Sequence, residues 1–322
     1  MRTAALAALA LLALTARPAA AVEPQKPYAE LGTRPMWIEP VKPGLYVVRG
    51  AIGVCMGPCA PNAVLDGALH EPGDVAVRVT PEGVIMVDTK FERDVPEVLR
   101  LIRTVTDQPV KYVLSSHYHG DHNGGLSEMI RRGAIAVSNE DLRAAYARTN
   151  PNAPASQVTF GDYGAIHLGG ATVEMYNFRG GHTRGDTFVY FPDLKVVHTG
   201  DVVIEGMPYI DYKDGGSAIG WVREIYDVLK LDFDWAIPGH GRLLTRDEVL
   251  DYVRKVEIMN ARMKDLVRQG VPAAESAKRL KLDDLGWDKS ASTSTFMAND
   301  FPAYYDEMAA VLAAEGRAHP PR

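Results

Sequence analysis

The chain has 322 residues, of which 41 are acidic and 35 are basic, and its formal net charge is −6. This length is enough for one large domain or two small ones. The acidic balance argues against nucleic acid as a substrate or partner, because binding a polyanion requires a basic surface.

Residues 1–21 have the features of a secretory signal peptide. Arg2 supplies a positive charge, residues 4–16 are apolar, and Ala19-Ala20-Ala21 fits a small-residue cleavage site. The apolar stretch is short for a membrane span and Pro18 follows it, so an uncleaved anchor is the less favoured alternative. We expect a periplasmic or secreted protein whose mature chain has no membrane span.

Apolar periodicity predicts strands that alternate with helices. The expected strands are 45–48, 75–79, 84–87, 111–114, 134–137, 171–177, 187–191, 195–198 and 235–237. The expected helices are 96–104, 126–132, 139–148, 219–230, 245–269, 273–280 and 302–314. Thr245 and Glu248 have the spacing of a helix capping box. Helices outside strands in both halves indicate an α/β fold of two packed sheets covered by helices on both faces.

Both cysteines, Cys55 and Cys59, lie in a long segment rich in Gly, Pro and Ala, residues 51–73. A connection of this length in a compact domain is usually functional or disordered. An oxidising compartment permits a disulfide between the two cysteines, which is the state we favour. Two free thiols or a redox couple are the alternatives, although the spacing differs from that of thioredoxin-like motifs.

Four potential metal ligands lie within six residues, in the run His117-Tyr118-His119-Gly120-Asp121-His122. Imidazole and carboxylate suit zinc and its first-row neighbours. In an extended segment residues i and i+2 point the same way, so His117 and His119 can bind one ion together. Asp121 and His122 are adjacent and would face a second point. The run predicts two metals, and a histidine-rich loop without ligands is disfavoured because the chain has only nine histidines.

Three more candidate ligands lie near the ends of predicted strands. A lone loop histidine is usually solvated, but these three complete a set with the first run. His182 follows Gly180-Gly181, Asp201 follows strand 195–198, and His240 follows strand 235–237. We predict that the first site has three nitrogen ligands, from His117, His119 and His182. The second site would have one carboxylate and two imidazoles, from Asp121, His122 and His240. The carboxylate of Asp201 would bridge the two ions.

These motifs closely resemble those of the metallo-β-lactamase-fold hydrolase superfamily. The HxHxDH motif of the family matches residues 117–122, and its later single His, Asp and His match His182, Asp201 and His240. The Asp that closes a strand in the family matches Asp88. The resemblance spans residues 45–244 and implies an αββα sandwich of two mixed sheets flanked by helices, with two Zn²⁺ ions at one edge, or iron or manganese instead.

The resemblance also implies a division of the chain. After the signal peptide we expect an N-terminal extension at residues 22–44 and a catalytic domain at residues 45–244. Residues 245–322 would form a helical segment packed on the same domain.

Asp201 narrows the choice within the family. Zinc β-lactamases have another residue near the second metal, whereas a bridging Asp resembles hydroxyacylglutathione hydrolases, acyl-homoserine lactonases, arylsulfatase-like members and tRNA-processing nucleases. Export and acidic charge argue against the nuclease, and His119 argues against the di-iron oxidoreductase branch, which has Glu at this position. We therefore expect at most weak or promiscuous β-lactamase activity.

The predicted chemistry is hydrolysis of a small-molecule ester, thioester, lactone or lactam. Water bound to metal has its pKa lowered to about 7, so a hydroxide between two ions can attack the carbonyl at neutral pH. Asp121 and Asp201 are the predicted catalytic residues. Asp121 would orient the hydroxide and pass its proton to the leaving atom, and Asp201 would bridge the ions.

Other side chains are assigned supporting roles. Asp88 and Asp186 are candidates to accept N–H bonds from ligand imidazoles and so fix their tautomers, with strand-end capping as the alternative. The predicted specificity loops are residues 51–73 and 205–217. Candidate substrate-binding residues, which alternatively only pack their loops, are Met207, Tyr209, Tyr212, Lys213 and Arg184.

Two other classes of function remain open. A non-catalytic zinc-binding protein would keep the ligands but bury the open coordination position. A periplasmic redox accessory protein would use Cys55 and Cys59 with iron. The sequence leaves the substrate and the oligomeric state open.

Overall fold

The computed structural model describes residues 35–50, 72–287 and 300–318. The predicted signal peptide, both cysteines and most of the 51–73 segment lie outside these residues. Among the helices that are described, none combines the length and the apolar character that crossing a membrane requires.

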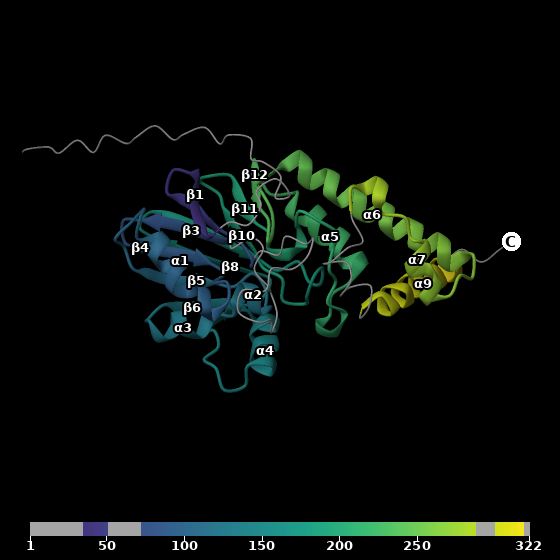
Figure 1. Cartoon of the computed structure of the whole chain (residues 1–322), viewed down its shortest axis with the longest axis horizontal. Helices are drawn as coiled ribbons and strands as arrows, with labels where there is room; N and C mark the ends of the chain where they lie inside the picture. The colour runs from purple at the N-terminus through teal and green to yellow at the C-terminus, as the bar shows by residue number, and fades with distance from the viewer. Residues whose placement is uncertain (1–34, 51–71, 288–299, 319–322) are drawn as a thin grey trace, which may run out of the picture.

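Two β-sheets form the centre of the molecule, with helices outside each of them (Figure 1). The seven-stranded sheet has the order β1-β2-β3-β4-β5-β6-β7. Its strands are antiparallel from β1 to β4 and parallel from β4 to β7. Their bounds are β1 Trp37–Lys42, β2 Leu45–Arg49, β3 Val75–Thr80, β4 Gly83–Val87, β5 Val110–Leu114, β6 Ile135–Asn139 and β7 Val158–Phe160.

The second sheet has six strands in the order β13-β12-β11-β10-β9-β8. Only β11 and β12 pair in parallel in this described sheet. The bounds are β8 Tyr163–Leu168, β9 Ala171–Tyr176, β10 Phe188–Phe191, β11 Val196–His198, β12 Trp235–Ile237 and β13 Leu244–Thr245.

The helices cover the two outer faces. On the side of the first sheet lie α1 Val95–Ile102, α3 Leu126–Arg131 and α4 Glu140–Thr149, and the short α2 Gly120–Asn123 contains Asp121 and His122 of the histidine run. On the other side lie α5 Ala218–Val228, α6 Arg246–Arg268, α7 Ala273–Arg279 and α9 Phe301–Ala318. The predicted capping box at the start of α6 is confirmed, since Thr245 and Glu248 bond each other's backbone amides.

Side-chain alternation along the strands divides the core into layers. On β4, Ile85 and Val87 point between the sheets, whereas Val84 and Met86 face the helices. Between the sheets they meet residues such as Val189 and Phe191 of β10. The third layer joins the outer face of the second sheet to α5, α6, α7 and α9 around the buried Trp221. The predicted αββα sandwich is therefore confirmed.

The strands that the sequence did not predict are β1, β7, β8 and β13. β1 contains Pro40 and is mostly half-buried, and β7 and β8 expose Val158 and Tyr163, so none shows a simple apolar pattern. β1 precedes residue 45 yet pairs with β2, so part of the predicted extension belongs to the sheet. The domain boundaries otherwise remain predictions.

A buried ion pair connects the first sheet to the loop after β12. The Arg49 guanidinium lies 2.6 Å from a carboxylate oxygen of Asp74, and both side chains are almost fully buried. Arg49 also donates to the carbonyl of Gly241, and the Asp74 amide donates to the carbonyl of Gly239 at 2.8 Å. The pair therefore fixes the backbone on both sides of His240.

Replacing Arg49 tests how much this pair supports the fold. Arg49→Met removes the guanidinium that pairs with Asp74 and Glu39 and bonds the Gly241 carbonyl, and we expect the free energy of unfolding to fall by about 3–5 kcal/mol. Lys230→Met is the control, because its pair with Asp227 lies on the surface and should contribute little. Denaturant unfolding of both variants measures the difference. Equal stabilities would show that the buried pair contributes no more than the exposed one.

Candidate metal centre

The seven predicted ligands meet at one edge of the sandwich. His117, His119, Asp121 and His122 follow β5, Asp201 follows β11, and His240 follows β12. His182 lies in the connection from β9 to β10. The carboxyl ends of strands from both sheets thus bring together residues that are up to 123 positions apart, from His117 to His240.

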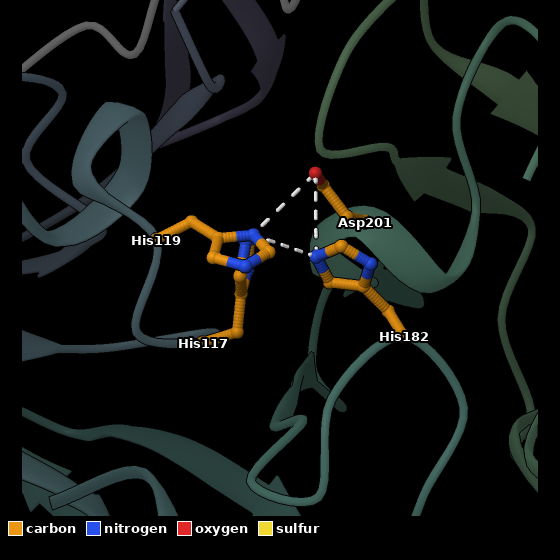
Figure 2. Close-up of side chains that lie close together, drawn as sticks. All are labelled: His117, His119, His182 and Asp201. Atoms are coloured by element: carbon orange, nitrogen blue, oxygen red, sulfur yellow. Dashed lines mark hydrogen bonds and ion pairs between the residues drawn. The ribbon is translucent and has the colours of Figure 1, made fainter. Parts of the chain in front are cut away.

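These side chains form two groups, and within each group the possible ligand atoms lie within 4.8 Å of one another. The first group contains His117, His119, His182 and Asp201 (Figure 2). The second contains Asp121, His122 and His240. Each group has the donor types and number for a first-row transition metal.

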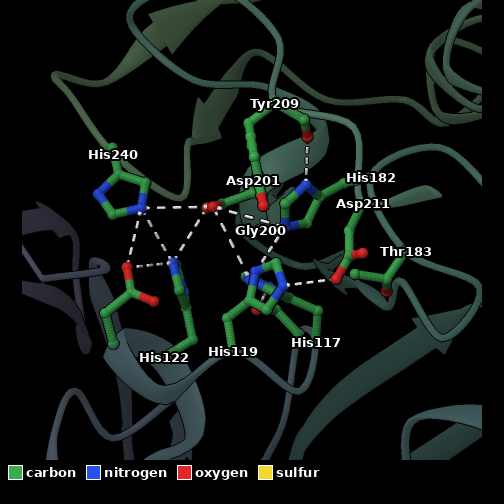
Figure 3. A network of polar contacts seen from close by, with 12 residues as sticks. His117, His119, His122, His182, Thr183, Gly200, Asp201, Tyr209, Asp211 and His240 are labelled. Atoms are coloured by element: carbon green, nitrogen blue, oxygen red, sulfur yellow. Dashed lines mark hydrogen bonds and ion pairs between the residues drawn. The ribbon is translucent and has the colours of Figure 1, made fainter. Parts of the chain in front are cut away.

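Asp201 belongs to the first group and also approaches the second (Figure 3). Its Oδ2 is 3.8 Å from His117 Nε2 and 3.7 Å from His182 Nε2 in the first group. Its Oδ1 is 3.0 Å from His122 Nε2, and its Oδ2 is 3.3 Å from His240 Nε2, in the second. The two oxygens of one carboxylate can therefore reach both positions.

The short distances between ring nitrogens are explained better by a metal ion between them than by hydrogen bonds alone. His117 Nε2 is buried and has no hydrogen-bond partner among the described residues. His122 Nε2 and His240 Nε2 lie 3.1 Å apart, and His182 Nε2 lies 2.9 Å from His119 Nδ1. Converging lone-pair donors of this kind are the arrangement that a cation between them would stabilise.

Four imidazoles place their other ring nitrogen against a hydrogen-bonding group. His117 Nδ1 lies 3.0 Å from Ser116 Oγ, and His122 Nδ1 lies 2.9 Å from Asp88 Oδ2. His182 Nδ1 lies 2.5 Å from the carbonyl of Tyr209, and His119 Nε2 lies 3.0 Å from Asp211 Oδ2. Such partners orient the ring and leave the opposite nitrogen for a metal.

Burial and charge have opposite effects on these rings. Burial lowers the pKa of His182 to about 4, and burial and the adjacent His122 ring hold the pKa of His117 well below its usual range. Neutral imidazole is the form that binds metal. Burial would also lower the pKa of His122, but the carboxylates of Asp201 and Asp121 outweigh it and raise the pKa to about 10. The second group thus has a negative potential that favours a cation.

Asp88 occupies a strained backbone position. Its φ is 64°, in the left-handed region that residues other than glycine seldom adopt, although Asp adopts it more often than most. Its carboxylate accepts from the Ser116 amide at 2.7 Å and the Ser116 hydroxyl at 2.6 Å, and it contacts His122. Asp88 therefore lies against the imidazole of His122, a predicted ligand.

Asp186 lies beside the centre but does not contact an imidazole, which corrects the first of its two predicted roles. Its carboxylate accepts from the backbone amides of His182 and Thr183 and from the Thr183 hydroxyl. The tight turn directs these amides, rather than the ring, at Asp186. The carboxylate caps the loop that carries His182, and burial raises its pKa to about 7.

The predicted substrate-binding residues have different surroundings. Tyr209 is half-buried, and its ring centroid is 6.1 Å from that of His119 and 5.7 Å from that of His182. Met207 packs into the core, and the Tyr212 hydroxyl donates to Glu307 of α9 at 2.6 Å. The remaining two, Arg184 and Lys213, are exposed. Among the five, Tyr209 has the ring contacts with predicted ligands.

Sequence reasoning did not single out Asp211, Arg49 or Asp74. Asp211 lies in a connecting loop far along the chain from His119, and its neighbours contain no motif. The Ser116 hydroxyl, which donates to the carboxylate of Asp88, was not singled out either. Only the fold reveals these contacts.

Two glycines allow the backbone to approach the ligands closely. A Cβ added to Gly73 would lie 2.1 Å from the ring of His122. A Cβ added to Gly239 would lie 1.9 Å from Asp201 Oδ1 and 2.7 Å from the backbone of Gly200. At both positions any side chain would displace a predicted ligand.

Comparison with known proteins agrees with this fold and geometry. The model of the metallo-beta-lactamase superfamily matches residues 70–240, more than half of the chain. The chain therefore belongs to the metallo-β-lactamase superfamily, as the motifs predicted. Its members are mostly metal-dependent hydrolases, although some are non-catalytic.

Individual relatives are distant. The chain is 26% identical over 228 residues to the alpha subunit of 2,4-dinitroanisole O-demethylase of Nocardioides sp. (strain JS1661), a match that covers 69% of this chain and 68% of the relative. It is 25% identical to the metallo-beta-lactamase type 2 of Bacillus cereus over 190 residues, covering 56% of this chain and 71% of the relative.

Solved structures show the same fold. A metallo-beta-lactamase from Pontibacter korlensis aligns with a TM-score of 0.59 and 21% identity, covering 69% of this chain and 99% of the other. A double mutant of the sec-alkyl sulfatase PisA1 aligns with a TM-score of 0.61 and 17% identity, covering 76% of this chain and 45% of the other. Identity at this level supports the fold alone.

Replacing Gly239 tests the close packing around Asp201. Gly239→Ala should displace Asp201 and lower the amount of metal bound per chain, as measured by elemental analysis after gel filtration. Gly161→Ala is the control, because a Cβ there meets nothing within 4 Å. If Gly239→Ala binds as much metal as the unmodified protein, Asp201 does not occupy the position described here.

Proposed function

We propose that the protein is a dinuclear zinc hydrolase that cleaves a carbonyl compound of small size. The observation that carries the proposal is the position of Asp201 between two groups of ligands, within 3.0–3.8 Å of imidazole nitrogens from both. His117, His119 and His182 would hold one ion. Asp121, His122 and His240 would hold the other, and Asp201 would contact both.

Two such ions, when bound, make water a nucleophile at neutral pH and polarise a carbonyl oxygen. The residues of the chain supply position and proton transfer. Asp121 Oδ2 lies 3.3 Å from His240 Nε2 at a partly exposed edge, where its carboxylate can accept a proton from the attacking water and return it to the leaving atom. His117 and His182, which would bind the ion of the first group, are buried.

The proposed substrates are esters, thioesters, lactones and lactams. Bridging Asp201 favours the first three over a dedicated β-lactamase, and similarity to β-lactamases leaves weak lactam hydrolysis as the second candidate. The relative named 2,4-dinitroanisole O-demethylase subunit alpha adds an aryl methyl ether to the compounds worth testing. Half-buried Tyr209, beside His119 and His182, can contact an apolar part of any of these.

We also propose that the protein acts in the periplasm or outside the cell. The charged, apolar and small-residue regions of residues 1–21 support this proposal. An acidic chain suits small neutral substrates better than polyanions.

A substrate panel tests the proposed reaction. We expect turnover of at least one chromogenic ester, thioester, lactone or cephalosporin, abolished by a chelator and restored by Zn²⁺. Turnover of an aryl methyl ether alone would contradict a carbonyl substrate. His117→Ala should lose most of this activity, because it removes a ligand from the first group. His167→Ala is the control, since His167 is an exposed residue of β8 that bonds Thr172.

The alternatives give different results. Two bound zinc ions without turnover of any compound would indicate the non-catalytic zinc-binding protein. One iron or no metal per chain would contradict the dinuclear zinc centre and favour the redox accessory protein.

A further inference from the structure

One loop contacts two histidines of the first group, His119 and His182. This loop, residues 209–217, begins with the Tyr209 carbonyl against His182 Nδ1 at 2.5 Å. Asp211 follows, with its carboxylate against His119 Nε2 at 3.0 Å. The Asp211 amide also donates to the His182 carbonyl at 2.9 Å. The loop therefore borders the first group of ligands.

The two oxygens of the Asp211 carboxylate have separate partners. Oδ1 accepts from the amides of Lys213 and Asp214, at 3.1 and 3.3 Å, and so shapes the turn. Oδ2 accepts from the Tyr118 hydroxyl at 2.5 Å and contacts His119 Nε2. One buried side chain thus joins the fold of the loop to the orientation of His119, and its contact with His119 is visible in Figure 3.

The C-terminal helix holds the other end of this loop. Glu307 of α9 accepts from the Tyr212 hydroxyl at 2.6 Å, from the Ser217 hydroxyl, and from the Ala218 amide at 2.9 Å. These bonds anchor the residues that flank the turn. The position of Asp211 is therefore determined by α9 as well as by the loop itself.

We propose that Asp211 is the positioning residue of the first metal site, and that it acts by fixing the ring of His119. The inference rests on the proposed function only in taking His117, His119 and His182 as ligands of one ion. A carboxylate at Nε2 favours the tautomer with hydrogen on that nitrogen, which leaves Nδ1 free to bind metal. Nδ1 is the atom that faces His182 Nε2 at 2.9 Å.

The effect should be confined to one of the two ions. His122 has its own carboxylate partner, Asp88, and the His240 loop is held through Arg49 and Asp74. The described contacts of the Asp211 side chain include neither His122 nor His240. Weakening Asp211 should therefore lower the affinity of the first site and leave the second unchanged.

Zinc titration of the full-length protein against a competing chromophoric chelator tests this inference. For Asp211→Asn we expect one of two zinc affinities to fall by about 10- to 100-fold while the other stays constant. Asp214→Asn is the matched control, because this carboxylate lies in the same loop but pairs with Arg148. We expect both affinities of that variant to equal those of the unmodified protein.

A second measurement needs no variant and so remains valid if Asp211→Asn does not fold. In the zinc-loaded, ¹⁵N-histidine-labelled protein, NMR should show His119 with its proton on Nε2 and zinc on Nδ1. His117 and His182 should show the opposite arrangement, because their Nδ1 atoms face Ser116 and the Tyr209 carbonyl.

The results separate this inference from the proposed function. Equal loss of both zinc affinities in Asp211→Asn, no loss of either, or zinc on Nε2 of His119 would overturn the positioning role. Those results leave the substrate panel untouched, since the titration and the NMR spectrum do not depend on turnover. An unmodified protein that binds fewer than two zinc ions would overturn both.

Discussion

The main constraint on the candidate metal centre is that its nitrogen and oxygen lone pairs are buried and point at one another. His117, His122 and His182 are almost fully buried, and Asp201 is nearly so. Buried polar atoms are costly unless they are hydrogen-bonded or bound to a metal. The outer nitrogen of each of these rings has a partner, whereas His117 Nε2 and Asp201 Oδ1 have no hydrogen-bond partner among the described residues, so a cation at the centre is what would satisfy them.

The αββα architecture makes this convergence possible. Strands β4 and β5 of one sheet and β11 and β12 of the other end at the same edge, so four separate loops can supply ligands or their partners. For the loops to meet, the backbone of one must lie directly against a predicted ligand of another. This explains why glycines, Gly73 and Gly239, lie against His122 and Asp201. The Arg49–Asp74 pair and Glu307 then hold those loops from outside the centre.

The two groups of predicted ligands have different supports. The first is bordered by the 209–217 loop, which the C-terminal helix holds. The second is supported by Asp88 and by the Arg49–Asp74 pair, both close to the first sheet. The C-terminal helices, which the family motifs do not cover, therefore contribute to the shape of the site. In the proposed dinuclear centre, this division would give the chain two regions in which metal affinity changes separately.

Much of the centre could be predicted from the sequence, because metal ligands in this family have fixed chemical types in a fixed order. His117, His182 and His240 stand beside glycines or strand ends that local patterns reveal. Asp211 could not be predicted, since its role arises from a tertiary contact with a residue 92 positions away. Asp186 shows the opposite failure: its local pattern suggested an imidazole contact, but a tight turn presents backbone amides to it instead. β1 and β8 were missed because half-buried edge strands lack a clear apolar alternation.

The central claim is that two metal ions lie on either side of Asp201. A crystal structure with anomalous diffraction data collected above and below the zinc edge tests it most directly. We predict two anomalous peaks per chain, one among His117, His119 and His182 and one among Asp121, His122 and His240, each within bonding distance of Asp201. A single peak, or two peaks that Asp201 does not contact, would contradict the account.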